Sequence, residues 1–361
     1  MSSHKPPKSL DDWVDEIHSD RDVHQQAARL HRLQNELQLA KDRERAFAQE
    51  LEAAKARVAF ASGLESAPTH KPIRAPRGKG RGKRTATAFA LASDWHLEEV
   101  VDSQKVSGRN EYNPDIARAR AGKFFSSTAW MIRHHSKTWE IPTLVLWLGG
   151  DLISGYIHDE LQESNALSPL ETALMAMDLV CGGIDYLGKE FPDMRLVVPC
   201  NHGNHGRMHI KPRIKTSAEN NLEWLLYQFL ARKYESDERV DFQVSRGRHS
   251  HLEVYDWVVH FAHGDDTRYN GGIGGLGIPL RKAVDRWNDT RHAHLNVFGH
   301  WHQLGSPHPD IVTNGSLIGF SEYSYAIKAS FEHPRQGFFL LDSTRGLTQL
   351  APLYVTDEGS M

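Results

Sequence analysis

Short apolar runs alternate with longer amphipathic segments over the last three quarters of the chain. The short runs have the length and composition of buried strands, and the longer segments place apolar residues at helical spacing. This alternation predicts an α/β domain over residues 85–361, in which helices cover sheets. The predicted strands are 87–92, 143–147, 195–198, 257–262, 294–298, 337–341 and 349–354, and the predicted helices lie around 113–136, 168–190, 216–234 and 278–292.

The N-terminal part of the chain has a different pattern. Between Val23 and Val58, apolar residues recur at alternating spacings of three and four among many Glu, Lys, Arg and Gln residues. This heptad pattern predicts a long amphipathic helix over 21–62, preceded by a disordered tail over 1–20. Self-association as a coiled coil is favoured, which would make the protein a homodimer. The alternative is a single helix that lies on the α/β domain.

A basic segment connects this helix to the α/β domain. After Gly63 the composition changes to Pro, Gly and basic residues, and no acid interrupts the run from Lys71 to Arg84. Because such a segment cannot bury a core, residues 63–84 are predicted to form a flexible linker. Its charge suits contact with the phosphate backbone of nucleic acid, and a solvated connector is the alternative interpretation.

Composition narrows the class of protein. The 361 residues are 39% hydrophobic and 25% charged, which fits one large globular domain with appended structure. A net charge of -3 argues against nucleic-acid binding by the whole surface and leaves the basic segment as a local patch. The two cysteines, Cys181 and Cys200, cannot build a thiolate zinc cluster or a disulfide framework. Neither a signal peptide nor a membrane-spanning run is expected, so we expect no membrane partner.

Side chains with metal-ligand chemistry follow five of the predicted strands. Since ligands of an open α/β sheet bind where the carboxyl ends of strands meet, we expect these side chains to converge. Carboxylate, imidazole and amide groups together suit divalent ions such as Mn²⁺, Fe and Zn²⁺. One such motif alone would mean little, but five in order predict a metal site. The motifs are Asp94-Trp95-His96, Gly150-Asp151, Gly203-Asn204-His205, His263-Gly264 and Gly299-His300-Trp301-His302.

In order and type these motifs resemble the calcineurin-like metallophosphoesterase superfamily, whose blocks run D-x-H, G-D, G-N-H-[DE], G/x-H and G-H-x-H. The match extends from about Thr85 to the C-terminal strands. It implies a two-sheet β-sandwich flanked by helices, with two divalent metal ions, Mn²⁺ favoured, between the sheet ends. The resemblance implies that one ion is held by Asp94, His96 and His302 and the other by Asn204, His263 and His300, with Asp151 bridging both.

The same resemblance makes His205 the general acid for the leaving group. Gly206 stands where the family carries an acid, so no neighbouring residue is expected to orient this ring, and Asp265 or Asp266 is the substitute. The preceding Asn-His pair, Asn201-His202, is an alternative to Asn204-His205. We favour the second pair because Gly203 precedes it, and a residue without Cβ permits a tight turn.

A carboxylate between two cations holds them about 3.5–4 Å apart, which suits in-line attack of an activated water on phosphorus. The predicted function is therefore metal-dependent hydrolysis of phosphodiester bonds. A DNA nuclease related to the SbcD repair-nuclease branch is favoured. The alternatives are a phosphatase or phosphodiesterase for small nucleotides and a non-catalytic, metal-bearing interaction scaffold.

Three further residues are candidates for substrate binding. Arg109 or Arg207 could hold a phosphodiester, and Tyr112 could stack on a base. The GNHGR sequence at Gly203 also resembles phosphoesterases of tailed bacteriophages. That resemblance implies a location in the bacterial cytoplasm during infection.

Overall fold

The computed structural model describes Gln38, Lys41 and residues 72–74, 83–267 and 275–356. The chain divides into two units, Met1–Thr69 and His70–Met361. In the first unit only Gln38 and Lys41 are described, and both are helical. The remainder of the predicted helix over 21–62, and the tail over 1–20, lie outside the described residues.

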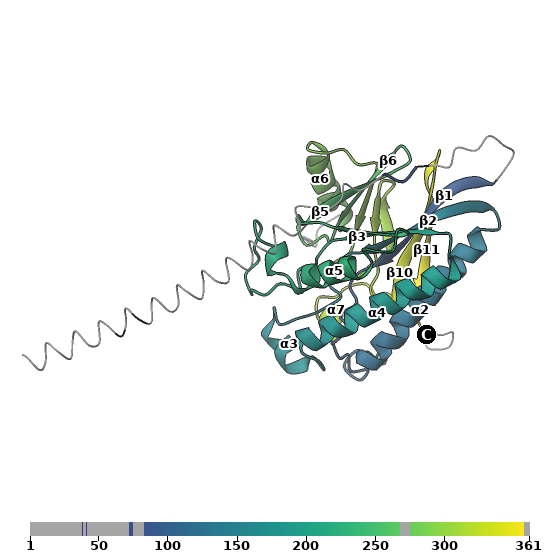
Figure 1. Ribbon diagram of the computed structural model, residues 1–361. Helices are drawn as coiled ribbons and strands as arrows, with labels where there is room; N and C mark the ends of the chain where they lie inside the picture. The colour runs from purple at the N-terminus through teal and green to yellow at the C-terminus, as the bar shows by residue number, and fades with distance from the viewer. Residues whose placement is uncertain (1–37, 39–40, 42–71, 75–82, 268–274, 357–361) are drawn as a thin grey trace, which may run out of the picture. The chain divides into compact units, whose positions relative to one another are not determined.

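Two mixed β-sheets form the centre of the second unit (Figure 1). The larger sheet has the order β11-β10-β1-β2-β3-β4, with β1 to β4 parallel and β10 antiparallel to both neighbours. Its strands are β1 (Arg84–Ala92), β2 (Trp139–Leu148), β3 (Arg195–Cys200), β4 (Val240–Val244), β10 (Arg335–Asp342) and β11 (Gly346–Tyr354).

The smaller sheet has the order β5-β6-β7-β9-β8. Its three central strands are parallel, and the two edge strands are antiparallel to their neighbours. The strands are β5 (His249–Val254), β6 (Trp257–Ala262), β7 (Leu295–Phe298), β8 (Gly305–His308) and β9 (Ile311–Thr313).

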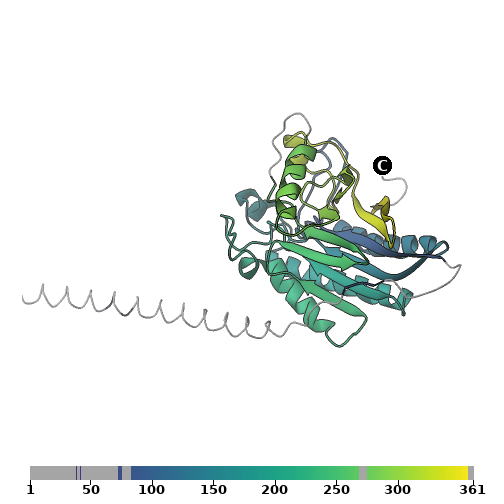
Figure 2. The same cartoon turned by 90° about the horizontal axis from the view of Figure 1, so that it is seen from above.

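Helices cover the outer face of each sheet, which gives four layers (Figure 2). The larger sheet is covered by α2 (Pro114–His135), α4 (Pro169–Glu190) and α5 (Leu222–Lys233), and the smaller by α6 (Gly277–Asn288). Shorter helices are α3 (Asp159–Ser164), η1 (Ala218–Asn220) and α7 (Glu322–Ala326). The predicted fold class, two sheets flanked by helices, is confirmed.

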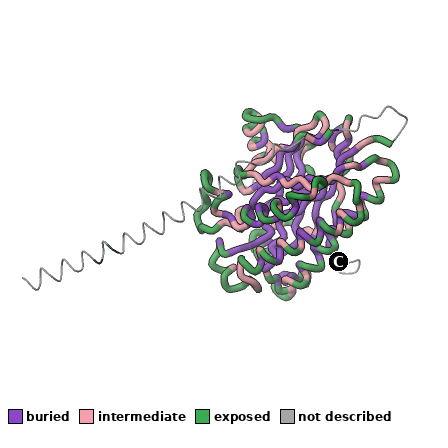
Figure 3. The backbone as a smooth tube through the Cα atoms, in the orientation of Figure 1, coloured by how far each residue is buried: buried purple, intermediate pink, exposed green. Residues whose placement is uncertain are grey.

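Strand β2 shows why its sequence is a continuous apolar run. Leu144, Leu146 and Leu148 pack in the core beneath the helices, whereas Val145 and Trp147 pack between the two sheets. Because both faces of the strand are buried, apolar residues occupy successive positions. The buried backbone accordingly concentrates in the strands (Figure 3).

Residues 72–74, within the segment predicted as a flexible linker over 63–84, pair with the smaller sheet. Ile73 pairs with Val254 in a parallel bridge, and its side chain is buried between the sheets. The Ile73 N–H donates to the Glu253 carbonyl at 3.0 Å, and the Ile73 carbonyl accepts from the Tyr255 N–H at 2.8 Å. An apolar side chain within a basic run thus contributes to the core.

Among the described residues, no helix combines the length and the apolar character that crossing a membrane requires.

Candidate metal centre

Six of the seven predicted ligands form two groups of side chains that could each hold a cation. In each group, one nitrogen or oxygen atom per residue lies within 4.8 Å of the others. The first group is Asp94, His96 and His302, and the second is Asp151, His263 and His300. These residues follow β1, β2, β6 and β7, so the ends of both sheets supply them.

The backbone at these positions is strained in a consistent way. A positive φ is unfavourable for a residue with a side chain and is concentrated at functional sites in proteins. Five of the seven predicted ligands have this conformation: Asp94 (57°), His96 (49°), Asp151 (51°), His300 (72°) and His302 (56°). Backbone hydrogen bonds between the loops hold it, as where the N–H groups of Trp95 and His96 both donate to the Asp151 carbonyl.

The first group brings the Asp94 carboxylate and two imidazole rings together. Ser154 Oγ donates to Glu99, so it accepts from His96 Nδ1 at 2.7 Å and leaves the His96 Nε2 lone pair facing the site. That nitrogen lies 3.3 Å from His302 Nε2, which is 3.5 Å from Asp94 Oδ1. Burial alone would lower the pKa of His96, but the Glu99 carboxylate raises it to about 9. The surroundings therefore favour positive charge at this group.

The second group has the same property. His263 Nδ1 donates to the Gly149 carbonyl at 2.8 Å, so its Nε2 lone pair faces Asp151 Oδ2 at 2.9 Å. Two acceptors at that distance repel each other unless a proton or a cation lies with them. Burial opposes charge on the imidazole, yet the Asp151 carboxylate raises the pKa of His263 well above its ordinary value. A divalent cation could take the place of that proton, so the donor set fits a metal ion.

Asn204 fits the role of the remaining ligand better than Asn201 does. Its Oδ1 atom is buried and has no hydrogen-bond partner in the described part of the chain. Asn201 Oδ1, in contrast, accepts from Trp147 Nε1 and from Ser250 Oγ, each at 3.0 Å. Asn201 therefore joins the two sheets, and Asn204 keeps a free amide oxygen.

His205 lies against both groups. Its backbone N–H donates to Asp151 Oδ1 at 2.8 Å, and its ring centroid is 4.9 Å from that of His96. Its Nδ1 donates to the Ser154 carbonyl at 2.9 Å, so this carbonyl orients the ring. Burial lowers the pKa of His205.

The suggestion that Asp265 or Asp266 orients His205 is wrong. Both carboxylates instead form ion pairs with Arg248. Asp266 Oδ1 lies 2.9 Å from Arg248 Nε. A side-chain acid is not needed, because the Ser154 carbonyl already accepts from His205 Nδ1.

The structure contradicts the predicted role of Tyr112 and gives Arg207 partners within its own loop, whereas the role of Arg109 stays a prediction. Tyr112 is fully buried and donates to the Trp95 carbonyl at 2.6 Å, so it cannot stack on a base. The Arg207 guanidinium donates to the carbonyls of Asn204 at 2.8 Å and Ile210 at 3.0 Å, which folds its own loop. Arg109 is exposed and lies over the Phe331 ring, 4.9 Å from its centroid.

Two buried glutamates that the sequence did not reveal hold the loops of the centre. Glu223 Oε1 accepts from the Leu152 N–H at 2.6 Å, and its Oε2 accepts from the Gly203 N–H at 2.7 Å. It therefore joins the loop after β2 to the loop after β3. Glu98 Oε1 accepts from the N–H groups of Ser154 at 2.9 Å and Gly155 at 2.8 Å. Burial raises the pKa of each carboxyl to about 7.

Glu223→Ala is expected to lower the free energy of unfolding by about 2–4 kcal/mol, because buried N–H groups in two loops lose their acceptor. Glu223→Gln should cost less, since its amide oxygen can still accept from one loop. Urea unfolding followed by circular dichroism measures both changes. Glu235→Ala, at an exposed residue just after α5, is the matched control and should stay within about 0.5 kcal/mol of wild type. Equal midpoints for Glu223→Ala and the control would contradict the bracing role.

No family model and no curated protein matches the sequence. Among solved structures, the chain is similar to an uncharacterised Streptococcus pneumoniae protein described as a predicted phosphoesterase, at 11% identity over 76% of this chain and 99% of that chain, with a TM-score of 0.26. Vacuolar protein sorting 29 from Cryptosporidium parvum is similar at 10% identity over 74% of this chain and 97% of that chain, with a TM-score of 0.30. A dimetal phosphatase from Danio rerio is similar at 10% identity over 76% of this chain and 100% of that chain, with a TM-score of 0.32. TM-scores this low establish neither a family nor an activity for this chain.

Proposed function

We propose that this protein is a binuclear metal-dependent phosphoesterase that hydrolyses phosphodiester bonds. The observation that carries the proposal is the pairing of two acceptor-rich groups, Asp94 with His96 and His302, and Asp151 with His263 and His300. Each holds a buried carboxylate beside an imidazole, His96 or His263, whose Nδ1 proton leaves the Nε2 lone pair facing inward. Such crowding of acceptors is stable only with compensating positive charge.

Two divalent ions, Mn²⁺ favoured, would supply Lewis acidity that activates water and offsets charge on the phosphoryl oxygens. The first group would hold one ion, and His263, His300 and the Asn204 amide oxygen would hold the other, with Asp151 shared. His205 keeps its Nδ1 proton on the Ser154 carbonyl, so only its Nε2 can pass a proton to the leaving oxygen. His205 is therefore proposed as the general acid.

DNA is the proposed substrate, which makes the protein a nuclease. The run from Lys71 to Arg84 contains seven basic residues and no acid, and such runs bind phosphate backbones.

The experiment is a hydrolysis panel on the purified full-length chain with Mn²⁺, Mg²⁺, Zn²⁺ or EDTA. Substrates are single- and double-stranded DNA, RNA, cyclic dinucleotides, and the mono- and bis-p-nitrophenyl esters of phosphate. We expect Mn²⁺-dependent hydrolysis of DNA and of the bis ester, with loss of activity in EDTA. Cleavage of the monoester alone would contradict diester specificity, and inactivity towards every substrate would contradict the proposed function.

A further inference from the structure

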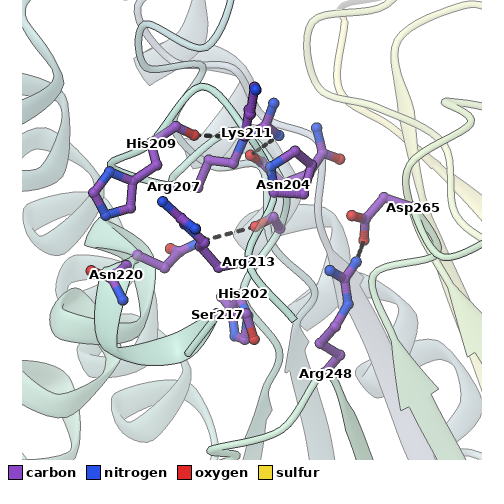
Figure 4. Close-up of a pocket in the computed structure, with 13 residues that line it drawn as sticks. His202, Asn204, Arg207, His209, Lys211, Arg213, Ser217, Asn220, Arg248 and Asp265 are labelled. Atoms are coloured by element: carbon purple, nitrogen blue, oxygen red, sulfur yellow. Dashed lines mark hydrogen bonds and ion pairs between the residues drawn. The ribbon is translucent and has the colours of Figure 1, made fainter. Parts of the chain in front are cut away.

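A basic pocket adjoins Asn204 and lies outside both ligand groups. It opens to solvent and is lined mainly by the loop after β3, together with Arg248 and Asp265. Figure 4 shows the residues of one loop, including Lys211 and Arg213, on one side, and Arg248 paired with Asp265 on the other. Most of the lining residues are polar and four are cationic, so the pocket suits an anion.

The loop that lines the pocket is rich in positive charge. Residues 207–215 hold four cationic side chains and no acid. Arg207 is occupied by carbonyl groups of its own loop, and Arg248 is paired with two aspartates. Lys211 and Arg213 are exposed, and neither has an ion-pair partner among the residues that the structure describes. These two side chains therefore supply free positive charge at the pocket.

His202 is a buried group in the lining that lacks a partner. Its side chain lies in the pocket wall, and the residue is only 6% exposed. Neither of its ring nitrogens has a hydrogen-bond partner in the described part of the chain. A buried polar group without a partner is costly, and groups of this kind in native proteins call for an explanation such as a ligand or an ordered water. A hydrogen-bonding ligand in the pocket would satisfy it.

Apolar side chains alternate with the cations on the same loop. Met208, Ile210 and Ile214 are 65%, 67% and 82% exposed. A single nucleic-acid strand presents phosphates and apolar base faces side by side, so a surface that mixes cations with apolar groups is complementary to it. A free inorganic anion would make no use of these side chains.

We propose that this pocket binds a second phosphate of a polynucleotide, adjacent to the diester at the metal centre. The inference rests on the proposed phosphodiesterase function and specifies its substrate class as oligonucleotides rather than mononucleotides. Lys211 and Arg213 contact the phosphate, and His202 donates a hydrogen bond to it from the pocket wall. A substrate with one phosphate leaves the pocket without a ligand.

The test compares the wild-type full-length chain with the double variant Lys211→Ala/Arg213→Ala. Binding of a fluorescein-labelled thymidine oligonucleotide is measured by anisotropy in EDTA, so that the readout does not depend on activity. We expect about tenfold weaker binding and a salt dependence reduced by about one to two units of log K against log salt. With Mn²⁺, kcat/KM for the oligonucleotide should fall about tenfold further than kcat/KM for bis-p-nitrophenyl phosphate.

Lys137→Ala/Lys189→Ala is the matched control. It removes the same charge from exposed positions just before β2 and at the end of α4, at the other ends of the strands. Equal oligonucleotide binding by the two double variants would overturn the inference, because the effect would then come from net charge. If all proteins bind the oligonucleotide in the expected order but none hydrolyses any diester, the pocket stands and the proposed activity fails. If Lys211→Ala/Arg213→Ala binds the oligonucleotide as the wild type does and diester hydrolysis is retained, the pocket proposal fails and the proposed activity stands.

Discussion

Asp151→Asn is expected to lower kcat for phosphodiester hydrolysis by at least about a thousandfold while the protein stays folded. The Asp151 carboxylate faces His263 Nε2 through Oδ2 and accepts from the His205 N–H through Oδ1. An asparagine keeps one oxygen for the N–H but loses the negative charge that two cations would share. The isosteric amide fills the same space, so the loss should be chemical rather than structural. Initial rates with bis-p-nitrophenyl phosphate, and bound metal measured by elemental analysis, check both parts.

The matched control for this variant is Asp193→Asn. Asp193 is exposed and lies just before β3, at the end of the sheet opposite the metal centre. Its substitution removes the same charge and should leave the rate and the metal content unchanged. Retention of more than about a tenth of wild-type activity by Asp151→Asn would exclude Asp151 from a bridging role. Unfolding curves for both variants establish that the comparison is between folded proteins.

The sequence predicted most of the strands that are buried on both faces, although it missed the three-residue strand β9. Strands β1 and β2 have apolar residues at successive positions because helices cover one face and the second sheet covers the other. Strands β4 and β5 were missed because many of their side chains are only partly buried, which removes that continuous run. The edge strand β8, with the sequence GSPH, has no strand-like composition at all. Its pairing with β9 depends on tertiary contacts that a local pattern cannot show.

The sequence likewise predicted the part of the candidate site that consists of local motifs, and missed the part that depends on contacts between distant residues. The side chains of the two cation groups follow strand ends and belong to spaced motifs, so local sequence reveals them. Glu223 accepts a hydrogen bond from the Leu152 N–H, 71 positions earlier in the chain. No local sequence pattern around Glu223 predicts that it connects two loops. Tyr112 was misjudged because a tyrosine in a polar loop gives no sign of being buried beneath Arg120, which lies over its ring. Such contacts exist only in the folded chain.

Gly203→Ala is expected to reduce kcat/KM for diester hydrolysis by about a hundredfold, because displacement of a catalytic group by about 1 Å has effects of that size. A Cβ atom at residue 203 would lie 2.0 Å from Asp151 Oδ1 and 2.4 Å from the Asp151 backbone nitrogen. One of the two loops must therefore move, and each carries a proposed metal ligand. The glycine is needed for this close approach, whereas the sequence suggested a tight turn. Steady-state kinetics and urea unfolding measure the two consequences, and overpacking should cost about 1–3 kcal/mol of stability.

Gly182→Ala provides the matched comparison, since it adds the same methyl group where nothing lies within 4 Å. Residue 182 is within α4, where alanine should raise the free energy of unfolding by about 0.5–1 kcal/mol and leave the kinetics unchanged. The two variants thus separate the steric requirement at Asp151 from the general effect of replacing glycine. If Gly203→Ala hydrolysed the diester at the rate of Gly182→Ala, the position of Asp151 would not depend on the contact with residue 203. The close packing of the two loops would then be a feature of the fold without consequence for the chemistry.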